Sequence, residues 1–179
     1  KKRYRYREAD PDKRSAFAGT LAELSPEDCV YIDEAGVENT LDYAYAYSPK
    51  GQPVVAERLG RFTERVSMIA AWCVGRAFAP MTFTGHCDSV LVETWFGQVL
   101  LPELRPGQTV ILDNASFHRR ARLKALLEPL GCTLLALPPY SPDLNKIEHL
   151  WHRIKSLVRH DRTPDRAFRA KVDAAFCSL

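Results

Sequence analysis

Three carboxylates in the sequence stand where a folded chain could bring them to one point. Asp33 lies at the end of the run "CVYIDE", Asp113 follows the apolar run "TVIL", and Glu148 opens the helical pattern after "LPPYSPDLN". Carboxylates about 5 Å apart repel by roughly 3 kcal/mol at an effective dielectric constant of about 20, so such a cluster requires a cation. Oxygen ligands suit Mg²⁺ or Mn²⁺, and two such ions about 3.5 to 4 Å apart can promote an in-line phosphoryl displacement.

Each of these carboxylates also has an ordinary interpretation. An Asp at a strand end is often a turn former or a helix cap, and a Glu on a helix often belongs to a solvated row of charges. Basic clusters such as "HRRARLK" and "HRIKSLVRHDR" flank the second and third acids. The combination favours a metal site that acts on a nucleic-acid backbone.

The position of Glu148 depends on a helix predicted to start near Asn145. Its apolar face is predicted to comprise Ile147, Leu150, Trp151, Ile154, Leu157 and Val158. Glu148 shares the adjacent edge with His152, Lys155 and Arg159, at helical spacing. We expect Lys155 and Arg159, on the same edge as the acid, to contact DNA.

Further candidates surround the three acids. Glu34 points to the opposite face from Asp33 if the strand continues, so it is at most an auxiliary ligand. His118 and Asn114 follow Asp113 closely, and both are candidates for contact with DNA. Contact with DNA, orientation of a metal-bound water and a hydrogen bond within the turn are all open for His118. Arg119 is either a phosphate contact or part of a solvated helix face.

Other acids and histidines carry less weight. Asp42 and Asp88 stand in settings typical of turns and caps. His149 and His152 form an HxxH pair without further ligands nearby in the sequence, so the pattern does not indicate zinc.

The elements that must position these residues form a mixed α/β pattern. A short helix is predicted at about 15–24 and strands at 29–34, within 41–54, at 65–75 and at 78–85, giving three or four antiparallel strands. A helix from 89, strand 109–114, helix 119–130, strand 133–138 and the helix after Pro142 then alternate, which requires parallel strands covered by helices. A final helix is predicted at about 165–176.

Length and composition favour one globular domain. The 179 residues include 46% hydrophobic and 26% charged residues, enough for a sizeable core. We expect this domain at 25–179, preceded by a basic linker and short helix at 1–24. No apolar run approaches the roughly 20 residues that span a bilayer, so a soluble, cytoplasmic protein is expected.

The motifs "IDEAG", "VILDNASFHRR" and "LPPYSPDLNKIEHLWHRIK" closely resemble the catalytic domain of bacterial insertion-sequence transposases of the IS630 group, within the Tc1/mariner superfamily. The resemblance covers about residues 7–159. In addition, 34 residues separate Asp113 from Glu148, a spacing that characterises many members of the superfamily. The resemblance implies an RNase H-like fold, with a mixed sheet of about five strands, three antiparallel and then parallel, and helices on both faces.

By the same resemblance, Asp33, Asp113 and Glu148 correspond to the acidic triad that binds two divalent ions, Mg²⁺ or Mn²⁺. The implied reaction is cleavage at transposon ends, followed by attack of the freed 3′-hydroxyl on target DNA, usually at TA dinucleotides. The implied partners are double-stranded DNA, as inverted repeats and target, and a second copy of the chain in a homodimer on DNA. No membrane partner is implied, and the implied location is the bacterial cytoplasm, at the nucleoid when DNA is bound.

Two features depart from the family pattern. Many relatives have Pro where this chain has Lys146, so we expect a less restrained turn before Glu148 and a lysine available to a phosphate. The family's upstream helix-turn-helix region has no counterpart in this sequence, so we expect a catalytic part whose recognition domain is missing, separately encoded or lost. The alternatives are an RNase H-like nuclease without strand transfer and a non-catalytic DNA-binding remnant of a transposase.

Overall fold

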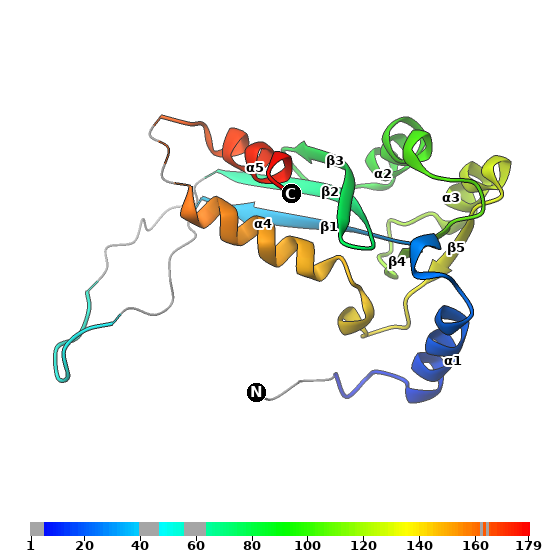
Figure 1. The fold of residues 1–179 in the computed structure, drawn as a ribbon, viewed down its shortest axis with the longest axis horizontal. Helices are drawn as coiled ribbons and strands as arrows, with labels where there is room; N and C mark the ends of the chain where they lie inside the picture. The colour runs from blue at the N-terminus through cyan, green and yellow to red at the C-terminus, as the bar shows by residue number, and fades with distance from the viewer. Residues whose placement is uncertain (1–5, 40–46, 56–63, 162, 164) are drawn as a thin grey trace.

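A five-stranded mixed sheet forms the centre of the molecule, in the order β3-β2-β1-β4-β5 (Figure 1). The computed structural model describes residues 6–39, 47–55, 64–161, 163 and 165–179. The strands are β1 (Cys29–Glu38), β2 (Arg65–Cys73), β3 (Arg76–Phe83), β4 (Thr109–Leu112) and β5 (Thr133–Ala136). The first three strands pair antiparallel, whereas β4 runs parallel to both β1 and β5. The predicted sheet of three antiparallel and then parallel strands is therefore confirmed.

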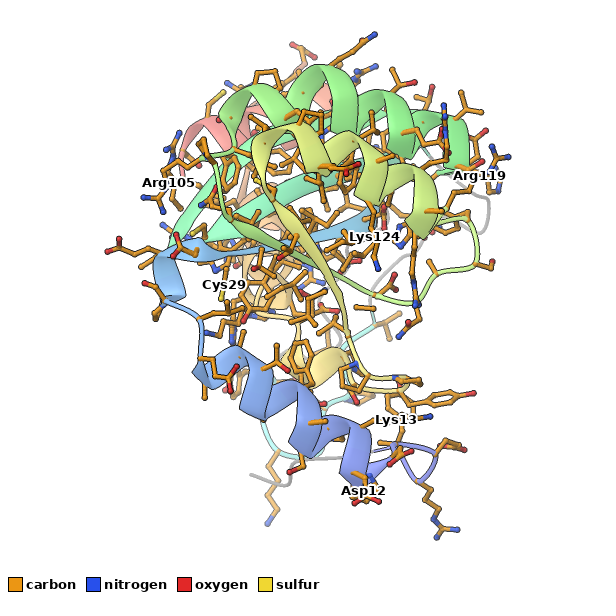
Figure 2. The ribbon with its side chains drawn as sticks, turned by 90° about the vertical axis from the view of Figure 1, so that its right-hand side faces the viewer. Asp12, Lys13, Cys29, Arg105, Arg119 and Lys124 are labelled. Carbon is orange, nitrogen blue, oxygen red and sulfur yellow. The ribbon has the colours of Figure 1, made fainter. Side chains whose placement is uncertain are left out.

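Helices cover both faces of this sheet because its central strands are apolar on both sides. Along β1, Val30 and Ile32 face one core, and Tyr31 faces the other. One core is closed by α1 (Pro11–Ala22), α4 (Glu148–His160) and α5 (Phe168–Cys177), and the other by α2 (Ser89–Trp95) and α3 (Arg120–Leu127). Figure 2 shows α2 and α3 above the sheet and α1 below it.

Local capping decides where the first helices begin. α1 starts four residues before the predicted Ser15, because Asp10 accepts hydrogen bonds from the backbone N–H groups of Asp12 and Lys13 and Pro11 occupies the first turn. The predicted cap Asp88 is confirmed, since its Oδ1 accepts from the Leu91 N–H at 2.8 Å. After α2 the chain continues through a π-helical turn (Phe96–Leu100) and a 3₁₀ turn (Leu101–Glu103).

The basic helix α3 (Arg120–Leu127) ends three residues before the predicted end at 130. A 3₁₀ turn (Glu128–Leu130) completes the predicted segment, and Gly131 closes it with a left-handed backbone at φ 63°. Such a conformation favours glycine because a Cβ atom would strain it. The chain then enters β5, which lies beside β4.

Of the strand and turn predicted within 41–54, only the turn is observed in the described residues. Residues 40–46, which include Asp42, Tyr43 and Tyr45, lie outside the described residues. Residues 47–55 contain no strand, but the Gln52 N–H donates to the Pro49 carbonyl at 3.0 Å, which forms the predicted turn.

The two C-terminal helices begin about three residues later than predicted. A 3₁₀ turn (Pro142–Leu144) comes first, and Asn145 is extended at φ −84° and ψ 105°, so α4 begins at Glu148. Its apolar face is buried except for Leu157, which is 36% exposed, so the prediction was wrong for that residue. Arg169 on α5 donates to the Thr82 carbonyl at 2.7 Å and ties that helix to β3.

Among the described residues, no helix is both long enough and apolar enough to cross a membrane.

Candidate active site

Asp33 lies in the part of β1 that extends beyond its pairing with β4. The prediction placed it at the strand's end, but β1 continues to Glu38 because its pairing with β2 continues there. Asp33 Oδ2 accepts a hydrogen bond from Trp151 Nε1 on α4 at 3.1 Å, and Oδ1 accepts from the Glu34 N–H at 2.9 Å. Burial, and then the nearby charge of Glu34, raises the pKa of Asp33 to about 7. The two hydrogen bonds to Asp33 therefore do not offset the cost of burying its charged carboxylate beside Glu34.

Asp113 follows β4 directly and sits in a polar turn. Its Oδ1 accepts from the Ala115 N–H at 2.9 Å and lies 3.2 Å from His118 Nδ1. The interaction with His118 lowers the pKa of Asp113, against the opposing effect of burial. Asn114 donates from Nδ2 to the Leu137 carbonyl, so the segment after β4 is fastened to the segment after β5. Asp113 is therefore ionised and held in place.

His118 connects the acids of two strands from inside the protein. Its Nε2 lies 3.0 Å from Glu34 Oε1, and only 2% of its side chain is exposed. Burial disfavours the charged imidazole, but the carboxylates of Asp113 and Glu34 outweigh this effect and raise the pKa of His118 to about 9. The imidazolium therefore links β1 to the turn after β4.

Glu148 is the first residue of α4 and is exposed. The fully buried Ile147 precedes it, and Leu150 and Trp151 pack in the core one turn later, so the start of the helix is fixed to the sheet. Lys146 stands where many relatives of the resembled family have proline, and its Nζ lies 5.4 Å from the centre of the Tyr31 ring. A cation–π contact of this kind attracts the Lys146 ammonium to the ring on β1, but it does not fix the backbone φ as proline would.

One cavity of about 790 Å³ brings the three predicted acids together. Asp33, Asp113 and Glu148 all line it, although they come from β1, the segment after β4, and α4. The other described residues of its wall are Tyr6, Glu34, Asn114, Ala115, Leu137, Pro138, Pro139, Tyr140, Ser141, Pro142 and Asn145.

The donor atoms of this cavity fit a hard divalent cation. They are carboxylate oxygens, and the raised pKa of Asp33 marks a negative charge that a cation would compensate. Asn145 Oδ1 is buried without a hydrogen-bond partner among the described residues. In the part of the chain that the structure describes, no group of three His, Cys, Asp or Glu side chains is close enough to hold an ion. The acids thus share a cavity without forming a preassembled cluster.

The structure separates the predicted DNA contacts into exposed and buried side chains. His118 is buried between the carboxylates of Glu34 and Asp113, and this position favours a structural role over contact with DNA. Lys146 is exposed. Asn114 is also exposed, but its side chain donates a hydrogen bond to the Leu137 carbonyl and accepts one from Arg120.

The remaining predicted contacts lie on helices. Arg119 immediately precedes α3, at the N-terminal end of the helix (Figure 2), and its Nη1 is 3.8 Å from Glu93 Oε1. On α4, Lys155 and Arg159 are half-buried, and Arg159 Nε has no hydrogen-bond partner among the described residues. None of these three residues lines the acidic cavity.

Two features of the site were not predicted. Glu34 lies on the face opposite Asp33, as strand alternation requires, yet it binds His118 and still lines the cavity. The adjacent acids in "IDEAG" and the histidine in "DNASFH" were the available signals, but their contact depends on how β1 and β4 pair. Trp151 was expected in the core and is buried there, but it also holds Asp33.

Comparisons with known proteins give the family of this chain. A family model described as a DDE superfamily endonuclease matches residues 28–168. Among curated proteins, an uncharacterised protein of Sinorhizobium fredii, y4pE/y4sA, is 45% identical over 42 residues, which cover 24% of this chain and 29% of that protein.

Solved structures of the Mos1 transposase share the fold. Its paired-end complex with the left transposon end superposes with a TM-score of 0.73 at 18% identity, over 100% of this chain and 59% of that chain. Its paired-end complex with Mn gives 0.75 at 16% identity, again over 100% and 59%. The chain therefore spans about 59% of the length of these transposase chains, and the predicted RNase H-like fold is confirmed. The chain belongs to the DDE superfamily of endonucleases and has the fold of a Tc1/mariner-type transposase catalytic domain.

Proposed function

We propose that this chain is the catalytic domain of a DNA transposase of the IS630 type, which cleaves DNA at transposon ends and joins the freed 3′-hydroxyl to target DNA, preferably at TA sites. The observation that carries the proposal is the single cavity lined by Asp33, Asp113 and Glu148 in a DDE-family chain. Its partners would be double-stranded DNA and a second copy of the chain, in the bacterial cytoplasm.

Asp33, Asp113 and Glu148 are the residues that would hold divalent ions, Mg²⁺ or Mn²⁺, two at a time in the proposed reaction. When bound, such ions activate the attacking oxygen and stabilise the leaving oxygen of a phosphodiester. The solved relatives include the Mos1 catalytic domain with Mn and with Mg, which supports this choice of ions.

The surrounding residues keep the acids in place during such a reaction. Trp151 Nε1 orients the Asp33 carboxylate, and His118 joins Asp113 to Glu34 without being exposed to solvent. Because both partners are buried, the two aspartates are held by the interior of the protein and not by the substrate. The exposed Glu148 is the acid with the most freedom to adjust to an ion.

Likeness to DNA complexes supports strand transfer in particular. A Mos1 strand transfer complex superposes with a TM-score of 0.74 at 17% identity, over 100% of this chain and 58% of that chain. Hydrolysis alone needs water as nucleophile, whereas transfer needs a DNA 3′-hydroxyl in the same position, so one site can carry out both steps.

The proposal is tested by offering the protein a duplex with a free 3′-hydroxyl end together with a circular target duplex. We expect nicked and joined products that require Mg²⁺ or Mn²⁺ and that disappear with Asp113→Asn. The control is Glu128→Gln, which removes an exposed acid outside the cavity and should react like the wild type. Nicking without joining would indicate a nuclease, and activity retained by a folded Asp113→Asn protein would contradict the assignment of the site.

A further inference from the structure

Two exposed tyrosines line the acidic cavity. Tyr6 and Tyr140 are each 59% exposed, and their ring centroids lie 6.3 Å apart with the rings tilted by 44°. Both residues belong to the wall that Asp33, Asp113 and Glu148 share. Aromatic rings contribute most to stability or binding when they are removed from water. An exposed pair of rings beside the acidic cavity therefore indicates a surface that binds a ligand.

The backbone holds Tyr140 in this exposed place. Its φ of 52° is in the left-handed region, which is uncommon for a residue with a bulky side chain and costs about 1 to 3 kcal/mol. The neighbouring Ser141 is buried, and its hydroxyl donates to the Pro139 carbonyl at 3.1 Å. The loop therefore holds the backbone of Tyr140 against its intrinsic preference, as is common at functional sites.

Tyr6 is brought to the same place by the start of α1. The Ala9 N–H donates to the Tyr6 carbonyl at 3.2 Å, in the turn that leads to the helix. On α1, both terminal nitrogens of Arg14 donate to the carboxylate of Asp143, at 2.9 and 2.7 Å. Only 14% of the Arg14 side chain is exposed, so this paired contact ties α1 to the loop that carries Tyr140.

The charges of the cavity determine what part of a substrate the rings can hold. Among the described residues of its wall, the charged ones are Asp33, Glu34, Asp113 and Glu148, all of them acidic. These residues offer no cationic side chain to a phosphate. The negative charge of this wall disfavours phosphate contacts and favours contacts with the bases and sugars of an entering DNA strand, and a base stacked on an aromatic ring contributes about 1 to 3 kcal/mol.

We propose that Tyr140, with Tyr6 beside it, stacks on an unpaired nucleobase next to the phosphate that reaches the acidic cavity. This inference rests on the proposed function and names the form of DNA that the site takes. The base has to be unpaired because a base inside a duplex has both faces covered by its neighbours.

The test uses the full chain with Asp113→Asn, so that the DNA is not cut. The probe is a short duplex with a single-stranded 3′ overhang that contains 2-aminopurine, whose fluorescence falls when it stacks on an aromatic ring. Tyr140→Ala is expected to weaken binding about 5- to 100-fold and to abolish the quenching. Tyr140→Phe keeps the ring and should retain both, and Tyr47→Ala, which removes an exposed tyrosine outside the cavity, should change neither.

An overhang with an abasic nucleotide in place of 2-aminopurine separates stacking from a structural effect. The protein that retains Tyr140 should bind the abasic probe more weakly than the 2-aminopurine probe, by about the factor that Tyr140→Ala costs on the 2-aminopurine probe. The Tyr140→Ala protein should bind the two probes with equal affinity. If both proteins lost the same affinity on removal of the base, the stacking inference would be overturned but the proposed function would not. The same holds if light scattering showed a dimer that the Tyr140→Ala substitution disrupts while DNA binding stays unchanged. Failure of the Tyr140-containing protein to bind either probe would overturn the proposed function as well.

Discussion

The charge on Asp33 is the most unfavourable feature of the site at the scale of single residues. The carboxyl group is surrounded by the core and by the charge of Glu34, and the hydrogen bond from Trp151 compensates only part of this cost. Asp113 has the opposite environment, because His118 and the Ala115 N–H both stabilise its charge. The two aspartates thus differ in what they gain from a cation, and Asp33 gains more.

A dependence of stability on pH follows for the metal-free protein. The pKa of Asp33 is raised from its ordinary 3.8 to about 7, so the folded state binds this proton more tightly than the unfolded state does. The stabilisation is complete below about pH 4 and is lost as the pH rises to about 7, by on the order of 4 kcal/mol. Asp33→Asn cannot lose a proton and should therefore become the more stable protein above pH 7.

Urea unfolding across this range in metal-free buffer measures the difference between wild type and Asp33→Asn. Repeating it with saturating Mg²⁺ is the control, because a bound cation should reduce the difference. If the unfolding free energies of the two proteins changed in parallel from pH 4 to 8, the described environment of Asp33 would be wrong.

The identities of Asp33 and Asp113 could be proposed from the sequence because each follows an apolar run of strand type. The role of His118 could not, because its burial depends on the contact with Glu34, which is 84 residues away in the chain. Glu34 itself was discounted by strand alternation, which is correct for its direction but does not exclude the cavity.

At the scale of elements, α4 decides where Glu148 stands. The helix contacts the sheet through one buried face and leaves the opposite face exposed, as its apolar spacing predicts. Its start was predicted three residues too early, because the extended Asn145 interrupts the helical pattern after Pro142. A spacing pattern gives the face of a helix more reliably than its first residue.

A pair of leucines on α4 tests this packing. Leu150 is 1% exposed and Leu157 is 36% exposed, although both were predicted on the same apolar face. Leu150→Ala should lower the free energy of unfolding by about 2 to 5 kcal/mol, because it leaves a cavity in the core. Leu157→Ala should cost less than about 1 kcal/mol. Equal losses in urea unfolding would contradict the described orientation of the helix.

At the scale of the whole molecule, the acidic cavity is assembled from segments that are far apart in the sequence. The strand β1, the turn after β4 and the start of α4 meet there, and α1 contributes through its tie to the loop after β5. The mixed sheet was predictable because strand and helix patterns alternate clearly in the second half of the chain. The role of α1 was not, because it depends on one contact between residues 129 positions apart.

We propose that Asp33, Asp113 and Glu148 form one site for divalent ions. Titration calorimetry with Mn²⁺ tests it most directly on four folded proteins: wild type, Asp113→Asn, Glu148→Gln and the control Glu128→Gln. We predict that wild type and the control bind Mn²⁺ with the same affinity and that Asp113→Asn abolishes measurable binding. Glu148→Gln should weaken Mn²⁺ binding at least about tenfold, because changing even a residue that only hydrogen-bonds a metal ligand weakens metal binding about 10- to 100-fold. Unchanged Mn²⁺ binding by Asp113→Asn and Glu148→Gln would contradict the claim.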